Sequence, residues 1–373
     1  MTAPPRDGRL APVEALLGEA MARGVFPGAV LHVRQAGQVV HHHAYGWAQV
    51  VPHRRPMTAG TLFDLASLTK PVTATAVLQL WERGALDIDR PVVAWLPAFA
   101  QAGKGAVTVR HLLTHTAGLP AWIRLYLHAA TPEVAVARIC STPPTAPPGT
   151  RFEYSDLGFI LLGELVRLAS GLPLDRYLAA HVAPALAWRR TRFRPPPSWR
   201  RTCAATELGN AYEEEQAGEE GAAFPWRREV IVGEVHDGNA HYAFGGVAGH
   251  AGLFGPAGEV ARLGQAMLDG GVLEGRRLLA PATVAEAVRD HTGPSLGSGC
   301  GLGWRTRTGT TFMGARASPR AFGHTGFTGT SIVVDPDRAL VVVLLTNRVH
   351  PRVDPAIETF RGPFHDALVE ALD

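Results

Sequence analysis

The sequence predicts a mixed α/β (α+β) protein with an antiparallel sheet that is flanked by helices and built from both termini, plus a mostly helical inserted domain. Strand patterns occur over residues 28–48 and again over 331–346. The residues between them are dominated by helical spacing and Pro/Gly-rich connections. Strands at both ends of one chain pair most simply in a single sheet. We therefore expect a discontinuous sheet domain, 1–60 with 291–373, and a helical domain, 61–290.

A helix, a hairpin and a second helix are predicted in the first part of the chain. Residues 11–23 have amphipathic spacing, and 28–35 and 38–48 form two strand patterns around an Ala-Gly turn. The helical pattern over 67–83 contains Pro71, which a helix tolerates only in its first turn. That position predicts a helix start close to Ser67.

The later elements follow the same reasoning. Phe159 to Ala169 is the clearest helix of the middle region. Three strand patterns follow near the end, and a closing helix ends the chain. Their predicted bounds are 303–308, 331–336 and 339–346 for the strands and 355–372 for the helix.

Composition excludes several classes of protein. The chain has 373 residues, 46% of them hydrophobic, and a net charge of +3. Such a charge gives no case for nucleic acid as a partner. No apolar run is long enough to span a bilayer, and no signal peptide is visible, so the sequence as written predicts a cytoplasmic protein, or a periplasmic or secreted one if a signal was removed. Three widely spaced cysteines predict neither disulfides nor a metal site.

Ser67 and Lys70 form the first chemical motif, in Ser67-Leu68-Thr69-Lys70. Residues three apart lie on one face of a helix, about 5–6 Å between Cβ atoms. An amine held there can take the proton of a hydroxyl and make it a nucleophile. This is the S-x-x-K arrangement of serine acyl-transfer enzymes.

Two further motifs lie downstream. Tyr154-Ser155-Asp156 precedes the helix at Phe159 and can present a phenol into a cleft. His324-Thr325-Gly326 leads into the strand at Ser331. A glycine there lets a substrate lie against the strand edge, where backbone N–H groups can bind it.

These three ordered motifs resemble the active-site motifs of the class C β-lactamase superfamily, which includes D-alanyl-D-alanine peptidases and β-lactamase-like carboxylesterases. The resemblance covers roughly residues 10–350. The stretches 203–207, 233–240 and 245–254 are similar to a subgroup that includes muropeptide amidases, which remove the peptide from N-acetylmuramic acid.

The resemblance implies a mechanism through an acyl-enzyme. Ser67 attacks an acyl carbon, and Lys70, Tyr154 or both take its proton. The oxyanion lies between the backbone N–H groups of Ser67 and Phe327, which are worth about 10²–10³ in rate. Asp156, His324, Thr325, Gly326 and Phe327 are then the expected substrate-binding and oxyanion residues.

Asp156 and His324 depart from the common pattern, where asparagine and lysine are more usual. An ionised carboxylate about 4 Å from Lys70 contributes about 4 kcal/mol toward keeping it protonated at an effective dielectric of about 20. Tyr154, with its pKa lowered by the cation, then becomes the better base. Both departures argue against a specialised β-lactamase.

Other polar groups need an interpretation. His236, Asp237 and His250 either anchor a loop or form a secondary site that contacts substrate or metal. The acidic run from Glu213 to Glu220 is expected to be solvated surface. Gly293-Pro294-Ser295-Leu296-Gly297 matches a nucleophile elbow but lacks the strand before it and the helix after it, so we interpret the match as chance.

The sequence therefore predicts a serine hydrolase acting on an amide or ester, with a peptidoglycan-derived muropeptide as the preferred substrate. A carboxylesterase or D-Ala-D-Ala peptidase with weak β-lactamase activity is the alternative. An inactive penicillin-binding-like ligand-binding protein is the alternative of another class. We expect no cofactor and no metal, and the expected partner is a small molecule or cell-wall fragment.

Overall fold

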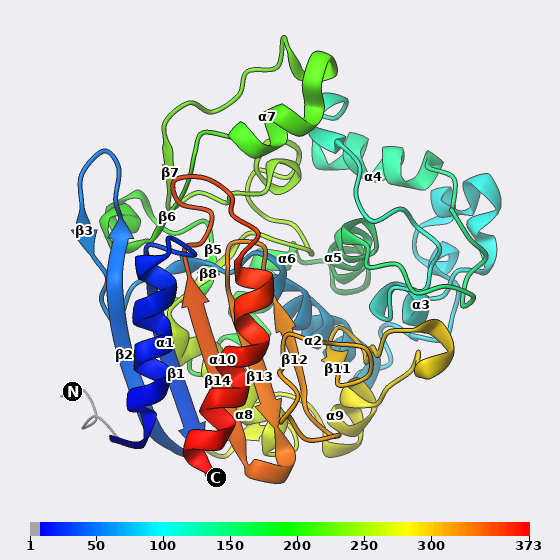
Figure 1. The fold of residues 1–373 in the computed structure, drawn as a ribbon. Helices are drawn as coiled ribbons and strands as arrows, with labels where there is room; N and C mark the ends of the chain where they lie inside the picture. Colours follow the sequence, from blue (N-terminus) through cyan, green and yellow to red (C-terminus); the bar gives the residue numbers. More distant parts are fainter. Residues whose placement is uncertain (1–7) are drawn as a thin grey trace.

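The computed structural model describes residues 8–373, and a seven-stranded antiparallel sheet organises it (Figure 1). The strand order is β11-β12-β13-β14-β1-β2-β3, so strands from the two ends of the chain meet at the β14–β1 pair. The strands are β1 (Gly28–Gln35), β2 (Gln38–Gln49), β3 (Arg55–Pro56), β11 (Arg305–Thr306), β12 (Phe322–Thr325), β13 (Ser331–Asp335) and β14 (Leu340–Thr346). The predicted sheet from both termini is thereby confirmed.

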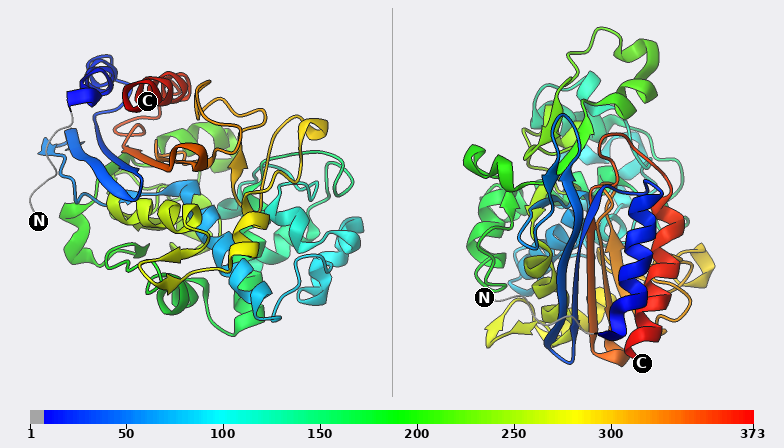
Figure 2. Two further views of the ribbon diagram at one scale, coloured as in Figure 1. Left: turned by 90° about the horizontal axis from the view of Figure 1, so that it is seen from below. Right: turned by 60° about the vertical axis from the view of Figure 1, so that its left-hand side comes forward.

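Alternation along the central strands explains the layers on either side of the sheet. Leu31 and Leu344, which are register partners, pack with helices α1 (Ala11–Ala22) and α10 (Ile357–Leu372). Val30 and Leu345, the next pair, point to the opposite face and join the core that contains α8 (Ala257–Leu268). Figure 2 shows α1 and α10 together on one side of the sheet and α8 on the other. Burial on both faces is why β14 is apolar from Leu340 to Leu345.

Helices dominate the region between the terminal strands. The central one is α2 (Thr69–Glu82), which is buried from Thr69 through Leu80 and packs against α5 (Asp156–Ser170). The other helices are α3 (Val109–Leu113), α4 (Pro132–Ser141), α6 (Leu174–Tyr177), α7 (Ala211–Ala217) and α9 (Pro281–Val288). Short strands complete the region: β4 (Phe63–Asp64), β5 (Arg192–Phe193), β6 (Ala205–Leu208), β7 (Val230–Val232), β8 (Leu253–Gly255), β9 (Val272–Leu273) and β10 (Arg276–Arg277).

The structure differs from the predicted elements in two places that matter for the site. β12 was not predicted as a strand, although it carries the third motif. The strand predicted over 303–308 is reduced to β11. In addition, α8 packs on the sheet although it lies within the predicted helical domain. The division at residues 60 and 290 stays a prediction.

Within residues 8–373, no single helix has the length and apolarity needed to cross a membrane. One bent pair, Asp156–Ser170 with Leu174–Val182, reaches the required length and composition only when both parts are counted, across a bend of 69°.

Candidate active site

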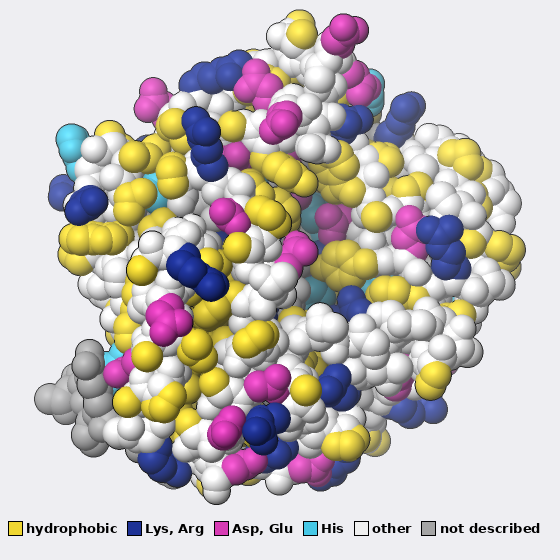
Figure 3. All heavy atoms as spheres, in the orientation of Figure 1, with side chains coloured by type: hydrophobic (Ala, Val, Ile, Leu, Met, Phe, Trp, Pro, Cys, Tyr) yellow, Lys and Arg dark blue, Asp and Glu magenta, His cyan; other side chains and the backbone are white. Residues whose placement is uncertain are grey.

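Residues of all three motifs line a cavity of about 450 Å³. It lies where the start of α2, the turn before α5 and the end of β12 meet α7 and the loop after β7. In the space-filling view, the face shown in Figure 1 is hollowed between the sheet and these helices (Figure 3). The lining residues are Asp64, Ala66, Ser67, Trp122, Tyr154, Asp156, Tyr212, Glu213, Gln216, His236, Asp237, His250, Ala251, Thr325, Gly326, Phe327, Thr328, Arg348, Glu358 and Arg361.

Ser67 and Lys70 meet as their spacing predicts. Ser67 lies in the 3-10 turn Ala66–Leu68, and Lys70 lies in the first turn of α2. The Nζ atom of Lys70 donates to Oγ of Ser67 over 2.6 Å. Pro71 occupies the first turn, where it removes no helical hydrogen bond. The hydroxyl and the amine therefore form one unit at the cavity floor.

Lys70 is a fully buried cation with a specific partner. Its Nζ atom lies 2.7 Å from Oδ1 of Asp156 and 3.5 Å from the carbonyl oxygen of His250. Burial lowers the pKa of Lys70, but the charges and hydrogen bonds of Asp156 and Tyr154 outweigh it, so the net shift is upward. Lys70 is consequently protonated in the resting site, as expected for an amine this close to the side chain of Asp156.

Tyr154 lies beside this pair, on the turn that leads into α5. The Nζ atom of Lys70 lies 4.7 Å from the centre of its ring, and Lys70 and Ser67 are both close enough to act on the pKa of its phenol. Its turn is fixed by His115, whose Nδ1 accepts from the Ser155 amide over 3.0 Å. Burial raises the pKa of Tyr154, and this effect exceeds the lowering by Lys70. The expectation of a lowered Tyr154 pKa was therefore wrong, because the ring is desolvated as well as close to a cation.

The third motif forms β12 and the turn after it. Thr325, Gly326 and Phe327 line the cavity, whereas His324 does not. His324 is buried 6.0 Å from the Tyr154 ring, and burial followed by the charge of Lys70 lowers its pKa to about 3. His324 is thus a neutral ring next to Tyr154 and does not line the cavity, and a contact of His324 with substrate stays a prediction.

The packing around position 326 requires a glycine, apart from any access that it gives a substrate. A Cβ atom there would lie 2.2 Å from Oγ1 of Thr330 and 2.6 Å from the carbonyl oxygen of Leu65. The end of β12 can therefore approach the nucleophile turn closely only because position 326 has no side chain. Thr330 also donates to the Leu65 carbonyl over 3.0 Å. These contacts bring Phe327 next to the Ser67 turn.

Asp64 is a site residue that the sequence reasoning missed. It is buried, and its carboxylate accepts from the amide of Ala66 over 2.9 Å and from the amide of His236 over 2.7 Å. Ala66 has a φ of 46°, a left-handed conformation that a residue with a side chain rarely adopts. Asp64 thus holds a strained turn directly before Ser67 and joins it to the loop of His236. In the sequence, its place three residues before Ser67 was the only available signal.

His236, Asp237 and His250 form two separate pairs at the cavity wall. His236 Nε2 lies 2.9 Å from Oε2 of the buried Glu207, and His250 Nε2 lies 3.0 Å from Oδ1 of Asp237. Burial lowers the pKa of His236, but Glu207 outweighs this and raises it. Burial raises the pKa of Asp237, but His250 outweighs this and holds it at about 2.

The possible metal-ligating atoms at this cavity suit a metal ion poorly. Ligand atoms of Asp156, Asp237 and His250 lie within 4.8 Å of one another. The ammonium of Lys70, however, already neutralises Asp156, and a metal ion would have to compete with it. The donor set therefore fits a cation poorly, and the expectation of no metal stays a prediction.

The acidic run was not uniformly solvated as expected. Glu213 is 6% exposed and lines the cavity, with its Oε1 accepting from the Gly238 amide over 2.8 Å. Burial and the nearby charge of Asp237 raise its pKa to about 7. The prediction of a solvated surface was wrong for this residue, because α7 turns Glu213 inward while Glu215 and Glu219 remain exposed.

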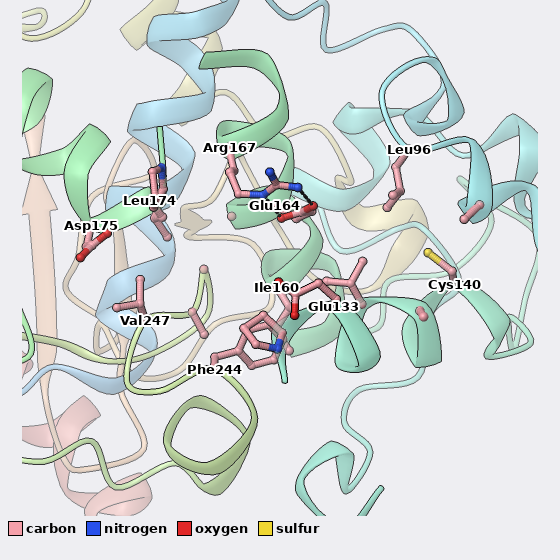
Figure 4. Close-up of a pocket in the computed structure, with 18 of the residues that line it drawn as sticks. Leu96, Glu133, Cys140, Ile160, Glu164, Arg167, Leu174, Asp175, Phe244 and Val247 are labelled. Atoms are coloured by element: carbon pink, nitrogen blue, oxygen red, sulfur yellow. Dashed lines mark hydrogen bonds and ion pairs between the residues drawn. The ribbon is translucent and has the colours of Figure 1, made fainter. Parts of the chain in front are cut away.

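A second cavity, of about 520 Å³, lies between α4, α5, α6 and the segment 244–249 (Figure 4). Its walls are largely apolar, with Ile160, Leu174 and Phe244 among them. Glu164 and Arg167 at its edge bond to each other. The one thiol in it, Cys140, has a pKa raised by burial and is not a thiolate. Among these two cavities, the one lined by Ser67 is therefore the candidate active site.

Comparisons with known proteins agree with this geometry. The sequence profile of the family described as Beta-lactamase matches residues 13–362. A protein of Escherichia coli (strain K12), provisionally named a D-alanyl-D-alanine carboxypeptidase, is 35% identical over 360 residues, spanning 88% of this chain and 80% of that protein.

Two further comparisons extend the likeness. The N-acetylmuramyl-L-alanine amidase of Bacillus subtilis (strain 168) is 35% identical over 384 residues, spanning 93% of this chain and 83% of that protein. The solved structure of EstCE1, described as a hydrolase with promiscuous acyltransferase activity, has a TM-score of 0.77 at 24% identity and covers 96% of this chain and 98% of its own. At that identity, the likeness shows a common fold.

Proposed function

Because this chain belongs to the Beta-lactamase family of serine hydrolases, we propose that Ser67 is its nucleophile and that it opens an amide bond through an acyl-enzyme. The single observation that carries the proposal is the contact of Ser67, Lys70 and Tyr154 at one cavity floor. A hydroxyl that is bonded to an amine and lies next to a phenol, at a cavity, is the arrangement that nucleophilic catalysis needs.

The charge of Lys70 decides the direction of the first proton transfer. Since Lys70 is protonated and donates to Ser67 Oγ, the proton of Ser67 leaves toward Tyr154. Tyr154 accepts it only as a phenolate, which its raised pKa makes the minor form, and the adjacent Lys70 cation stabilises that form. The bond from Oγ to the acyl carbon forms as this proton moves.

The tetrahedral intermediate then collapses. Its C–N bond breaks, and Tyr154 returns the proton to the leaving nitrogen, so the products of this step are a free amine and an ester on Ser67. Tyr154, again a phenolate, takes a proton from water as the water oxygen attacks the ester carbon. The bond from that carbon to Ser67 Oγ then breaks, and Oγ takes the proton back from Tyr154. The peptide is released as an amine and the acyl group as a carboxylic acid.

The amides of Ser67 and Phe327 are the proposed oxyanion donors. Both residues line the cavity, and within residues 8–373 no acceptor is bonded to the Phe327 amide. The carbonyl of Phe327 faces the other way and accepts from Nε of Arg348 over 2.6 Å. An amide fixed in this manner can stabilise charge without reorganising.

A muropeptide is the proposed substrate class, with the amide between an N-acetylmuramyl group and a peptide as the bond that is cut. The similarity to the Bacillus subtilis amidase over 93% of this chain supports it. A D-alanyl-D-alanine peptide is the second candidate, because the Escherichia coli relative is equally similar. A small ester is expected to react as a surrogate, because the chemistry needs only an acyl group and a leaving group.

The test of the nucleophile uses a matched pair of serines. Ser67→Ala should abolish covalent labelling by a fluorophosphonate and turnover of p-nitrophenyl acetate. Ser295→Ala, in the elbow-like sequence whose serine bonds the Thr292 carbonyl, should keep both. Labelling that persists in Ser67→Ala would refute the proposal.

The substrate test compares N-acetylmuramyl-L-alanine, a D-alanyl-D-alanine peptide and nitrocefin on the wild-type protein. We expect release of free alanine from the first to exceed turnover of the other two. Faster release of D-alanine from the peptide would favour the second candidate.

A further inference from the structure

The cavity at Ser67 carries two exposed aromatic rings that the reaction does not use. Trp47, Tyr212 and Phe327 are the exposed Trp, Tyr and Phe residues within residues 8–373, and two of these three line this cavity. The rings of Tyr212 and Phe327 lie 5.4 Å apart. An apolar surface left uncovered beside a reactive centre is typical of a ligand-binding surface.

The Phe327 ring is held in place from two other sides. His236 stacks on it at 5.7 Å with an interplanar angle of 22°, and the guanidinium of Arg348 lies 4.5 Å from its centre. A ring fixed by neighbours loses little entropy when a ligand covers it. The Phe327 ring is therefore already held in place before a ligand binds.

One buried carboxylate sets the positions of both rings. Glu207 accepts from His236 Nε2 through Oε2 and from the Tyr212 amide through Oε1, over 2.9 and 2.8 Å. His236 in turn stacks on Phe327. Glu207 thus ties the start of α7 to the turn after β12, two segments far apart in the sequence.

Polar groups surround these rings in a pattern that excludes a purely apolar ligand. Glu213 and Gln216 share α7 with Tyr212, and Asp237, Arg348 and Glu358 line the same cavity. An acyl chain would need a continuous apolar wall. A flat ligand with apolar faces and a rim of hydroxyl and amide groups matches rings interspersed with carboxylates and a guanidinium. A pyranose with an N-acetyl group has that shape.

We propose that Tyr212 and Phe327, with Trp122, form a sugar subsite that binds an N-acetylated pyranose on the acyl side of the scissile amide. The proposal rests on the proposed function and deepens it, because it names the part of the substrate that the enzyme selects. Trp122 lines the cavity and packs at 6.0 Å against Tyr126 of the aromatic cluster beneath α7. In this arrangement, the segment carrying α7 selects the substrate and the Ser67 turn carries out the chemistry.

The experiment compares two substrates that share the scissile bond and differ in the sugar: N-acetylmuramyl-L-alanine and N-lactoyl-L-alanine. For the wild-type protein, kcat/KM should favour the sugar-bearing amide at least about tenfold, which corresponds to about 1.4 kcal/mol. Tyr212→Ala should raise KM for it by about fivefold to tenfold, whereas Tyr212→Phe should restore most of the loss. Equal kcat/KM for the two amides would overturn the proposal.

Trp47→Ala is the matched control, because Trp47 is as exposed as Tyr212, at 37%, and lies on β2 outside the cavity. It should leave the ratio of the two amides unchanged. A Tyr212→Ala variant that lowers kcat for both amides equally would show a general disturbance of the site and contradict a sugar subsite.

A binding measurement separates this proposal from the proposed function. N-acetylmuramic acid alone is titrated into the wild-type protein and into Tyr212→Ala, with binding followed by calorimetry. Weaker binding to the variant supports the subsite whether or not Ser67 is acylated. Absent or equal binding overturns the subsite, even if fluorophosphonate labelling confirms Ser67.

Discussion

Lys70 and Asp156 form an ion pair 2.7 Å long at the floor of the cavity, and Lys70 is fully buried. A buried ammonium without a partner would lose its proton, so this carboxylate keeps the charge on the amine. The same charge faces Ser67 and Tyr154. The identity of residue 156 therefore controls which group can act as the base.

Asp156→Asn should move the acid limb of the pH–rate profile to lower pH. The Asp156 carboxylate raises the pKa of both Lys70 and Tyr154, so its removal lowers both. Whether Lys70 or Tyr154 acts as the base, it then loses its proton at lower pH. We expect a shift of at least about one pH unit in kcat/KM for p-nitrophenyl acetate. Glu358→Gln, a change on the exposed rim of the same cavity, is the control and should leave the limb in place; an unmoved limb in Asp156→Asn would contradict the electrostatic assignment.

Lys70→Arg and Lys70→Met should differ if Tyr154 is the base. Arginine keeps the cation but cannot act as a base near neutral pH, so it should retain part of the stabilisation of the Tyr154 phenolate. We expect acylation by Lys70→Arg to exceed that by Lys70→Met by about tenfold or more, and Tyr154→Phe to lower it by about 10²–10⁴. The burst of p-nitrophenol measures acylation. Equal loss in the two lysine variants, with a mild effect of Tyr154→Phe, would assign the base to Lys70 instead.

Gly326→Ala should impair the reaction more than it impairs folding. The added Cβ would lie 2.6 Å from the Leu65 carbonyl, so either the turn after β12 or the nucleophile turn must move. A displacement of about 1 Å between reacting groups can cost about 10² in rate. Turnover of p-nitrophenyl acetate should therefore fall by about that factor. Gly18→Ala on α1, where no atom lies within 4 Å of the added carbon, should keep full activity.

Glu207→Gln should destabilise the protein, because it removes the carboxylate that is hydrogen-bonded to the buried His236. Breaking such a buried pair costs about 3–5 kcal/mol, measured as the free energy of unfolding in urea. The pKa of His236 is raised in the folded state. The contribution of the pair is therefore complete below the unfolded pKa of about 6.5 and is lost as pH rises through the folded value.

The control for this prediction is an exposed pair of the same type. His128 and Glu220 lie 3.0 Å apart, close to the 2.9 Å of the buried pair, but both are nearly half exposed. Glu220→Gln should change the free energy of unfolding by less than about 1 kcal/mol at any pH. A similar small effect of Glu207→Gln would show that the buried pair contributes little.

Local signals in the sequence were sufficient to predict most of the long helices and strands and the motif at Ser67. The spacing of apolar residues predicted α1, β1, β14 and α10 close to their observed bounds, because period and burial face are properties of neighbouring residues. The helix start that places Ser67 and Lys70 together was likewise indicated by Pro71. β12 was missed because four residues that include a glycine and a histidine carry too little periodicity.

The sequence by itself determined the fold class, the family and the pairing of a hydroxyl with an amine one helical turn away. Only the tertiary structure decided that Glu213 is buried, that His324 lies next to Tyr154 and that Asp64 supports the nucleophile turn. It also decided that Tyr154 has a raised pKa. The reason is physical: exposure and pKa depend on how much water distant segments exclude and which charges they bring close, and no short stretch of sequence contains those neighbours.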